Sequence, residues 1–223
     1  MLVFSLVYGL YVGLPFAAPV FMHWGWEAPA RWIYAAYALV CHQMPQRSFF
    51  LFGPKGMYSL PEIQAAWKAT FNPLVLRQFV GNAAMGWKVA WSDRMVAMYT
   101  SLLLWAWLWW PLRKRLRPLR GWLFVALLTP LGVDGFTHLL SDAWRGVGRG
   151  FRYTNAWLAA LTNHAFPATF YMGDALGSFN SWMRLVSGVL FGLAVVGWMF
   201  PMLDAYFEAY AEQARRHQEE QGL

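Results

Sequence analysis

The sequence predicts an all-α protein, a polytopic transmembrane bundle of about five helices. Of its 223 residues, 13% are charged, 58% hydrophobic and 19% aromatic, whereas about a quarter of the residues in a soluble domain are charged. Several apolar stretches approach or exceed the ~20 residues that one helix needs to cross about 30 Å of hydrocarbon. We therefore expect a single transmembrane domain over residues 1–203 and a cytoplasmic amphipathic tail over residues 204–223.

The apolar stretches also give the expected positions of the spans. The first lacks the basic start of a signal peptide, which favours a span. The second is short, so the sequence leaves open whether residues 28–43 fully cross. The predicted spans are residues 1–22, 28–40, 95–112, a segment that begins at Gly121, and 183–203.

Two further segments are expected to lie outside these spans. Ser59-Leu60-Pro61-Glu62 forms a capping box with proline in the first turn, so a short extramembrane helix is predicted near residues 60–69. Residues 155–172 are apolar but contain Asn163, His164 and Pro167. An interfacial or re-entrant segment fits this composition better than a sixth crossing.

A short basic run predicts the topology in the cell membrane. Five of the eighteen basic residues lie between Arg113 and Arg120, next to two apolar segments. Lys and Arg in such loops stay on the cytoplasmic side. With five spans, the N-terminus is then outside and the tail is cytoplasmic. The same assignment explains much of the net charge of +7, so no nucleic-acid partner is expected.

Polar residues from several segments are expected to meet near the outer side. Asp134 lies thirteen residues after Gly121, or ~20 Å into its span. An ionisable group at that depth costs at least ~2.5 kcal/mol and is usually paired. We expect it to pair with Arg94 or Arg184, in an outer pocket shared with His42. The candidate ligand-binding residues are Cys41, His42, Gln43, Arg47, Ser92, Asp93, Arg94, Asp134, His138, Asn180 and Arg184.

This cluster has three interpretations that the residues leave open. Its ion pairs could only hold the helices together, form a polar cavity for an ion, headgroup or small ligand, or ligate a cofactor. His42 with Asp93 and Asp134 is conceivable as a transition-metal site, and His138 or His164 could ligate a haem or chlorin. Neither the spacing nor the single cysteine demands a metal. The sequence therefore assigns no cofactor, metal or catalytic residue.

Four blocks of residues resemble a known family. The stretch Cys41-His42-Gln43-x-Pro45-x-Arg47-Ser48 resembles the signature of a family of bacterial and archaeal membrane proteins catalogued as a domain of unknown function. The resemblance covers most of residues 38–195 and implies a membrane fold without an established activity. Its other blocks are Lys88-Val89-Ala90 with Arg94, Ala97 and Tyr99; Pro130 to His138; and Asn180 with Arg184, Gly188 and Gly192.

The chain departs from this family pattern in two places. The resemblance implies a second cysteine shortly before Arg94, where this chain has Ser92, which puts a dithiol or disulfide role in doubt. The segment from about Trp144 to Gly177 is longer than the usual family connection and suggests a docking surface.

Two functions of different kind agree with these observations. The first is an accessory or structural subunit of a larger membrane complex, respiratory or photosynthetic, with lipid and other membrane subunits as partners. The abundance of Trp, Phe, Tyr and Met on a small bundle favours it. The alternative is a small membrane enzyme or transporter with an outward-facing polar site for an ion, an anionic lipid or a small ligand. The residues do not establish whether a reaction is catalysed.

Overall fold

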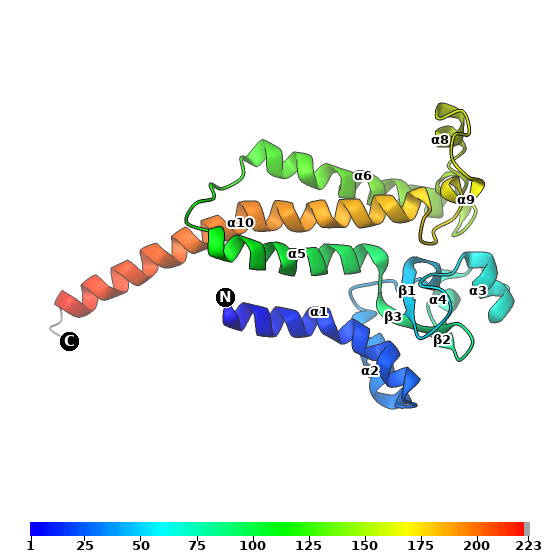
Figure 1. Ribbon diagram of the computed structural model, residues 1–223, viewed down its shortest axis with the longest axis horizontal. Helices are drawn as coiled ribbons and strands as arrows, with labels where there is room; N and C mark the ends of the chain where they lie inside the picture. The colour runs from blue at the N-terminus through cyan, green and yellow to red at the C-terminus, as the bar shows by residue number, and fades with distance from the viewer. Residues whose placement is uncertain (221–223) are drawn as a thin grey trace.

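Four long helices form the body of the protein. A computed structural model describes residues 1–220 and is mainly helical. In Figure 1 the long helices lie side by side in the order α6, α10, α5, α1, and each packs against its neighbour in that row. Within the described residues, four helices are long and apolar enough to cross a membrane: α1 (Leu2–His23), α5 (Asp93–Leu112), α6 (Gly121–Arg145) and α10 (Phe179–Glu220). The predicted helical membrane bundle is confirmed.

The crossing expected over residues 28–40 is not formed. In its place α2 (Glu27–Tyr37) has 11 residues, which is a rise of ~16 Å and about half of the hydrocarbon thickness. Gly25, at φ 78°, turns the chain so that α2 packs back on α1. Residues 1–220 therefore contain four candidate spans and not five.

The number of spans changes where the N-terminus lies. Met1 and Phe4 pack with Trp109 and Phe200, and the Trp107 indole donates a 2.9 Å hydrogen bond to the Ser5 hydroxyl. The start of the chain is thus at the same end of the bundle as the 113–120 loop (Figure 1). Five spans required the opposite end, so that expectation is wrong.

Two glycines bring α5 and α10 into close contact. A Cβ atom on Gly188 would lie 2.6 Å from the Ala97 Cβ, and one on Gly192 would lie 2.3 Å from the Ser101 Oγ. The Ser101 hydroxyl also donates to the Gly188 carbonyl at 3.2 Å. Small residues four apart allow such backbone approach between membrane helices. This contact fixes the relative position of the polar residues at the start of both helices.

Pro201 within α10 explains a link to the loop between α5 and α6. Proline has no N–H group, so the carbonyl four residues earlier, on Gly197, loses its helical partner. The Leu119 N–H donates to that carbonyl at 2.9 Å. Beyond Pro201 the helix continues without interruption into the tail, as expected for an extension of the last span.

The rest of the chain forms a cap at the opposite end of the bundle. Residues 41–92 contain a three-stranded antiparallel sheet in the order β1-β3-β2, which the sequence analysis did not predict. The 144–177 connection adds short helices to the same end (Figure 1). The elements of the cap are η1 (Pro45–Arg47), β1 (Ser48–Leu51), α3 (Leu60–Ala66), α4 (Pro73–Leu76), β2 (Gly81–Asn82), β3 (Gly86–Ser92), α7 (Phe151–Thr154), α8 (Ala156–Leu161) and α9 (Ala168–Tyr171).

Both segments predicted outside the spans are formed in the cap. The backbone N–H of Ser59 donates to Glu62 at 2.8 Å, and the predicted capping box is present at the start of α3. Residues 155–172 form α8 and α9, which are far too short to cross. The turn that joins these two helices places Asn163 and His164 at positive φ.

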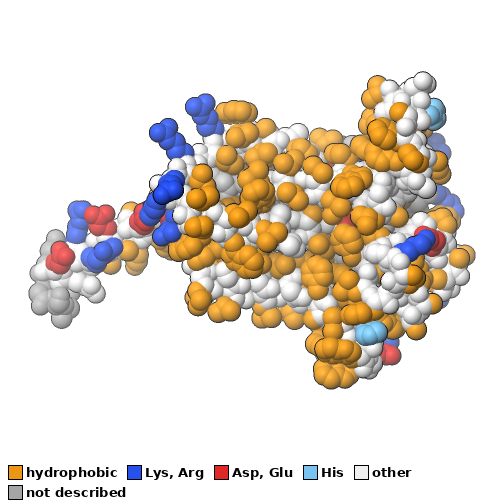
Figure 2. Space-filling model, viewed as in Figure 1, with side chains coloured by type: hydrophobic (Ala, Val, Ile, Leu, Met, Phe, Trp, Pro, Cys, Tyr) orange, Lys and Arg blue, Asp and Glu red, His pale blue; other side chains and the backbone are white. Residues whose placement is uncertain are grey.

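The surface is that of a membrane protein. Figure 2 shows apolar side chains over much of the visible face of the long helices, while most of the visible Lys and Arg lie near the 113–120 loop and the tail. Large apolar residues such as Leu6, Trp122 and Phe136 are each 65% or more exposed. Exposed apolar surface on this scale is stable against lipid and not against water.

We predict that Gly192→Leu destabilises the bundle, because a side chain there overlaps Ser101 and Leu102 of α5. Overpacking of this kind costs about 1–3 kcal/mol, which should lower the melting midpoint of the detergent-solubilised protein. Gly132→Leu on α6 is the matched control, since a Cβ there meets no atom within 4 Å. Equal melting midpoints for the two variants would contradict the close α5–α10 contact.

Candidate functional site

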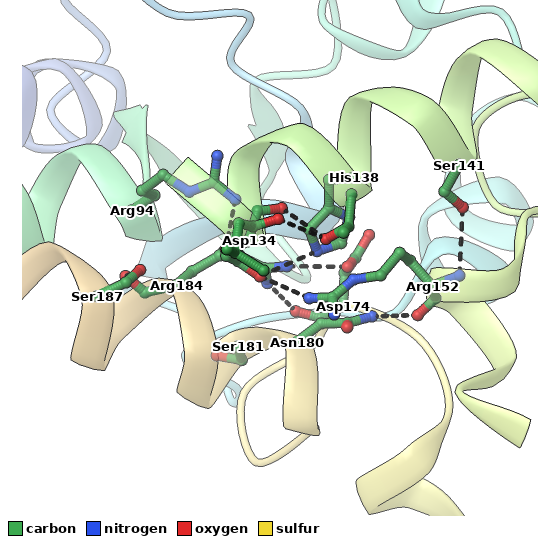
Figure 3. Close-up of polar contacts among 12 residues, drawn as sticks. Arg94, Asp134, His138, Ser141, Arg152, Asp174, Asn180, Ser181, Arg184 and Ser187 are labelled. Carbon is green, nitrogen blue, oxygen red and sulfur yellow. Dashed lines mark hydrogen bonds and ion pairs between the residues drawn. The ribbon is translucent and has the colours of Figure 1, made fainter. Parts of the chain in front are cut away.

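A network of four arginines and four aspartates lies where the bundle meets the cap. We call it the charge network. Its members come from the first residues of α5, the second half of α6, the start of α10 and the cap segments that cover them (Figure 3). The number of positive and negative groups is equal, so their formal charges cancel. The members are Arg47, Arg94, Arg152 and Arg184 with Asp93, Asp134, Asp142 and Asp174.

Asp134 is held between two arginines. Its Oδ2 accepts from Arg94 at 2.6 Å, and its Oδ1 accepts from Arg152 at 2.5 Å. The predicted pairing of Asp134 with Arg94 or Arg184 is therefore confirmed for Arg94. The second partner, Arg152, comes from the cap and was not anticipated. Two guanidinium groups satisfy much of the hydrogen-bonding capacity of a carboxylate that is only 1% exposed.

The remaining members form a second chain of ion pairs. Arg184 donates to Asp93 at 2.8 Å and to Asp174 at 2.9 Å. Arg47 donates to the other oxygen of Asp174 at 3.0 Å and to Asp142 at 3.1 Å. Burial alone would raise the pKa of Asp174, but the charges of Arg47 and Arg184 outweigh it and hold that pKa well below its usual range. This aspartate is charged at neutral pH.

His138 lies inside the network without a hydrogen bond. Its Nε2 is 3.8 Å from the Asp134 Oδ1, and neither ring nitrogen has a hydrogen-bond partner although the residue is only 3% exposed. A buried polar group without a partner is destabilising by about 1–3 kcal/mol. The His138 ring therefore has one donor and one acceptor nitrogen that no protein group satisfies.

His42 lies at the edge of the same network. The residue keeps an exposed surface. Partial burial, followed by the charges of Arg47 and Arg94, lowers the pKa of His42 to about 3. The imidazole is neutral at physiological pH and is available as a hydrogen-bond acceptor.

Cys41, Gln43 and Ser92 form a separate group at the end of β3. The Cys41 thiol donates to the Ser92 hydroxyl at 3.7 Å, so the position where the resemblance implies a second cysteine contacts the first. The Gln43 amide donates to the Tyr34 carbonyl at 2.8 Å. Buried Lys88 donates to the Gln43 carbonyl at 2.9 Å, and burial lowers the pKa of this lysine to about 7. The group holds α2, β3 and the start of the cap together.

Asn180 fastens the cap to α10. Its side-chain amide donates to the carbonyls of Arg152 at 2.5 Å and Gly173 at 2.8 Å. Asn155, in the left-handed conformation at φ 41°, donates to the Tyr171 carbonyl at 2.7 Å. These bonds position Arg152 and Asp174, so Asn180 acts on the network through the cap.

A cavity of about 700 Å³ lies next to the network. Asp174 belongs to both, and Tyr153, whose hydroxyl accepts from Arg47, also lines the cavity. Apolar residues of the cap, such as Leu60, Phe71 and Met172, line much of it. Gln46 is also in the lining; it is fully buried, and neither atom of its amide has a hydrogen-bond partner. Cavities of this size that combine apolar walls with a few polar groups are typical small-molecule sites.

A family match contains every member of the charge network except Arg47. The family described as "Predicted membrane protein (DUF2085)" matches residues 83–198, which is more than half of the chain. The chain belongs to this family. The matched range contains Asp134 and Arg184 but begins after Cys41-His42-Gln43. The signature expected at residues 41–48 therefore stays a prediction.

The chain is also similar to an archaeal protein whose name assigns no activity. "Uncharacterized protein MJ1492" of Methanocaldococcus jannaschii is 28% identical to this chain over 158 residues, which are 66% of this chain and 76% of that protein. No solved structure matches the chain.

The structure brings no metal site together from the predicted residues. Among residues 1–220, no three His, Cys, Asp and Glu side chains are grouped so that they could hold a metal ion. Each carboxylate of the proposed trio of His42, Asp93 and Asp134 is instead bound by arginine.

Four residues of the charge network and the adjoining cavity were missed by the sequence analysis. Arg152 and Asp174 belong to the long connection, which was interpreted as a docking surface, and Asp142 lies shortly before it. A signal did exist, because Asp174 is the single acidic residue between Asp142 and Asp204, and an isolated charge in an apolar segment is usually paired. Gln46 had no such signal, since it occupies an unspecified position of the resembled signature.

We predict that Asp134→Asn destabilises the folded protein by about 3–5 kcal/mol, because it leaves two poorly exposed guanidinium groups without their counter-charge. Denaturant midpoints in mild detergent measure the change. Asp204→Asn, at the loop end, is the control; its contacts with Arg113 and Lys114 are 3.8 and 3.7 Å long, so its loss should cost less than about 1 kcal/mol. A small effect at both positions would contradict a structural role for the network.

Proposed function

We propose that this multi-pass membrane protein binds a small ligand in the 700 Å³ cavity of the cap, with the charge network as a rigid floor. The observation that carries the proposal is the Gln46 amide, which is fully buried, lines the cavity and has no partner within the protein. Buried amides are almost always hydrogen-bonded. A ligand that offers both an acceptor and a donor would satisfy Gln46.

The surroundings of Gln46 favour a neutral, amphipathic ligand. The charges of the network cancel among themselves, so the floor presents no excess charge that would select an ion. Within the walls, Lys55 and Glu62 are paired with each other. Leu176 and Met172 at the cavity are more than half exposed, which suits an apolar part of the ligand. Carboxamides and hydroxyl compounds with a hydrocarbon portion meet both requirements. The proposal is one of binding and assigns no reaction.

A second candidate function is that of an accessory subunit of a larger membrane complex, respiratory or photosynthetic. The observation that favours it is the exposed apolar surface of the 155–172 segment, where Trp157, Leu161 and Phe166 are 48%, 76% and 49% exposed. Such a surface suits protein or lipid contacts. The native mass of the gently solubilised protein distinguishes this candidate, because a monomer in mild detergent argues against it.

For the orientation, we propose that the cap faces the outside of the cell membrane and that both ends of the described chain lie on the cytoplasmic side. The basic run from Arg113 to Arg120 supports this direction. The four candidate spans then place the start of α1 and the end of α5 on one side. The cavity and the charge network lie at the outer side under this orientation.

We expect a membrane-impermeant maleimide applied to intact cells to label Ala83→Cys in the cap but neither Leu2→Cys nor Arg117→Cys. Each change is made with Cys41→Ser, which removes the native thiol, and all three positions are exposed. Labelling of Arg117→Cys with protection of Ala83→Cys would reverse the orientation.

We expect a small molecule to copurify with the protein and to be lost when Gln46 is replaced. Native mass spectrometry of the solubilised protein should show at least a tenfold lower ratio of ligand-bound to free protein for Gln46→Leu, equivalent to about 1.4 kcal/mol. Gln78→Leu is the control, because the Gln78 amide is on the surface and bonds to the Leu74 carbonyl. The proposal fails if Gln46→Leu retains the same adduct as Gln78→Leu. It also fails if neither variant carries an adduct and Gln46→Leu is only the more stable of the two.

A further inference from the structure

A second hollow lies at the cap end of α6, apart from the ligand cavity. It has a volume of about 420 Å³ and shares no lining residue with the first cavity. No acidic residue takes part in its lining, which includes Leu140, Trp144, Arg145, Arg149, Phe151 and Thr154.

The two arginines of this hollow have no counter-charge. Within residues 1–220, neither Arg145 nor Arg149 forms an ion pair or a side-chain hydrogen bond, and both are exposed. The nearest acid along the chain, Asp142, is already bound by Arg47. The Arg149 guanidinium lies over the Phe71 ring at 3.9 Å, which holds it in place but leaves its N–H donors free.

An apolar stripe on α6 leads to the hollow. Val133, Phe136, Leu140 and Trp144 recur at helical spacing and are 43% to 76% exposed, so they share one lipid-facing side. From the first to the last of them the helix rises ~17 Å. This length is close to half of the ~30 Å hydrocarbon thickness, which is the depth of one leaflet.

The apolar stripe lies at the depth of the hydrocarbon, and the two arginines lie at the depth of the headgroups. The 25 residues of α6 rise ~38 Å, so the stripe ends and the arginines begin where the hydrocarbon gives way to headgroups. Trp144 lies at this boundary, the usual depth of interfacial tryptophans.

We propose that the hollow binds the phosphodiester of an anionic phospholipid. Arg145 and Arg149 bind the phosphate oxygens, and an acyl chain lies along the stripe from Trp144 to Val133. Guanidinium groups form strong charge-assisted hydrogen bonds with phosphate. The adjoining stripe favours a phosphate that carries acyl chains. Free phosphate has no apolar part that could contact the stripe. The site is independent of the ligand cavity and of Gln46.

The test is a native mass spectrometry titration of the full chain in mild detergent with dioleoylphosphatidylglycerol. Arg145→Gln should lower the affinity for the most tightly retained lipid about tenfold, and Arg145→Gln with Arg149→Gln about a hundredfold. Arg145→Gln alone removes no hydrogen bond or ion pair among residues 1–220, so its effect is separable from misfolding. Arg115→Gln with Arg117→Gln is the matched control, since these arginines are exposed at the other end of the bundle.

Several outcomes would overturn the lipid site. Equal losses in the control pair would mean generic attraction between basic protein and anionic lipid. Dioleoylphosphatidylcholine retained as tightly as the anionic lipid would remove the requirement for a net negative headgroup. Inorganic phosphate that displaces the lipid at equal concentration, or protects the protein from thermal unfolding as well as the lipid does, would assign the hollow to free phosphate. Failure of the Gln46 experiment leaves these results unaffected.

Discussion

The Arg184 guanidinium binds Asp93 at the start of α5 and both the side chain and the backbone carbonyl of Asp174 in the cap. These three residues are at most 2% exposed. Taking such charges out of water is costly, and the pairing recovers the loss only when all partners are present. One arginine therefore joins two membrane helices and the cap in a single arrangement. Asp134 has the same role for α6, through Arg94 and Arg152.

The close approach of α5 and α10 makes this arrangement possible. Gly188 and Gly192 let the two backbones touch, so Asp93 and Arg184 meet without a gap that water would fill. The cap covers these ion pairs, and the Asn180 side chain on α10 holds it in place by hydrogen bonds to cap carbonyls. Packing and electrostatics thus support each other. The ligand cavity next to the network has a firm boundary on this side, which agrees with the preformed shape that small-molecule sites usually have.

Features with a local or energetic signal could be predicted from the sequence. The spans at α1, α5, α6 and α10 follow from length and hydropathy, the start of α3 follows from its capping box, and the pairing of Asp134 with Arg94 follows from the cost of a lone charge in lipid. The short α2 was misassigned because an apolar run of borderline length fits either a span or a packed helix. The resulting error of one span reversed the expected position of the N-terminus.

The sheet and half of the charge network had no comparable signal. β1 has four residues and β2 two, and their pairing with β3 depends on contacts distant in sequence. Arg152 and Asp174 reach the network only because the long connection folds back over α10. Gln46 is one polar residue in a polar segment, and its importance comes from its lack of a partner. Such a property exists only in three dimensions.

The unbroken α10 also sets the distance between the bundle and the last turns of the tail. Its 42 residues rise ~63 Å, about twice the thickness of the hydrocarbon. The Leu119 bond to Gly197 holds the helix where it leaves the bundle, and residues 204–220 continue for ~25 Å beyond. The far part of α10 is in effect a spacer. Any molecule that binds its last turns is kept roughly a small domain's width away from the basic loop and from the lipid headgroups.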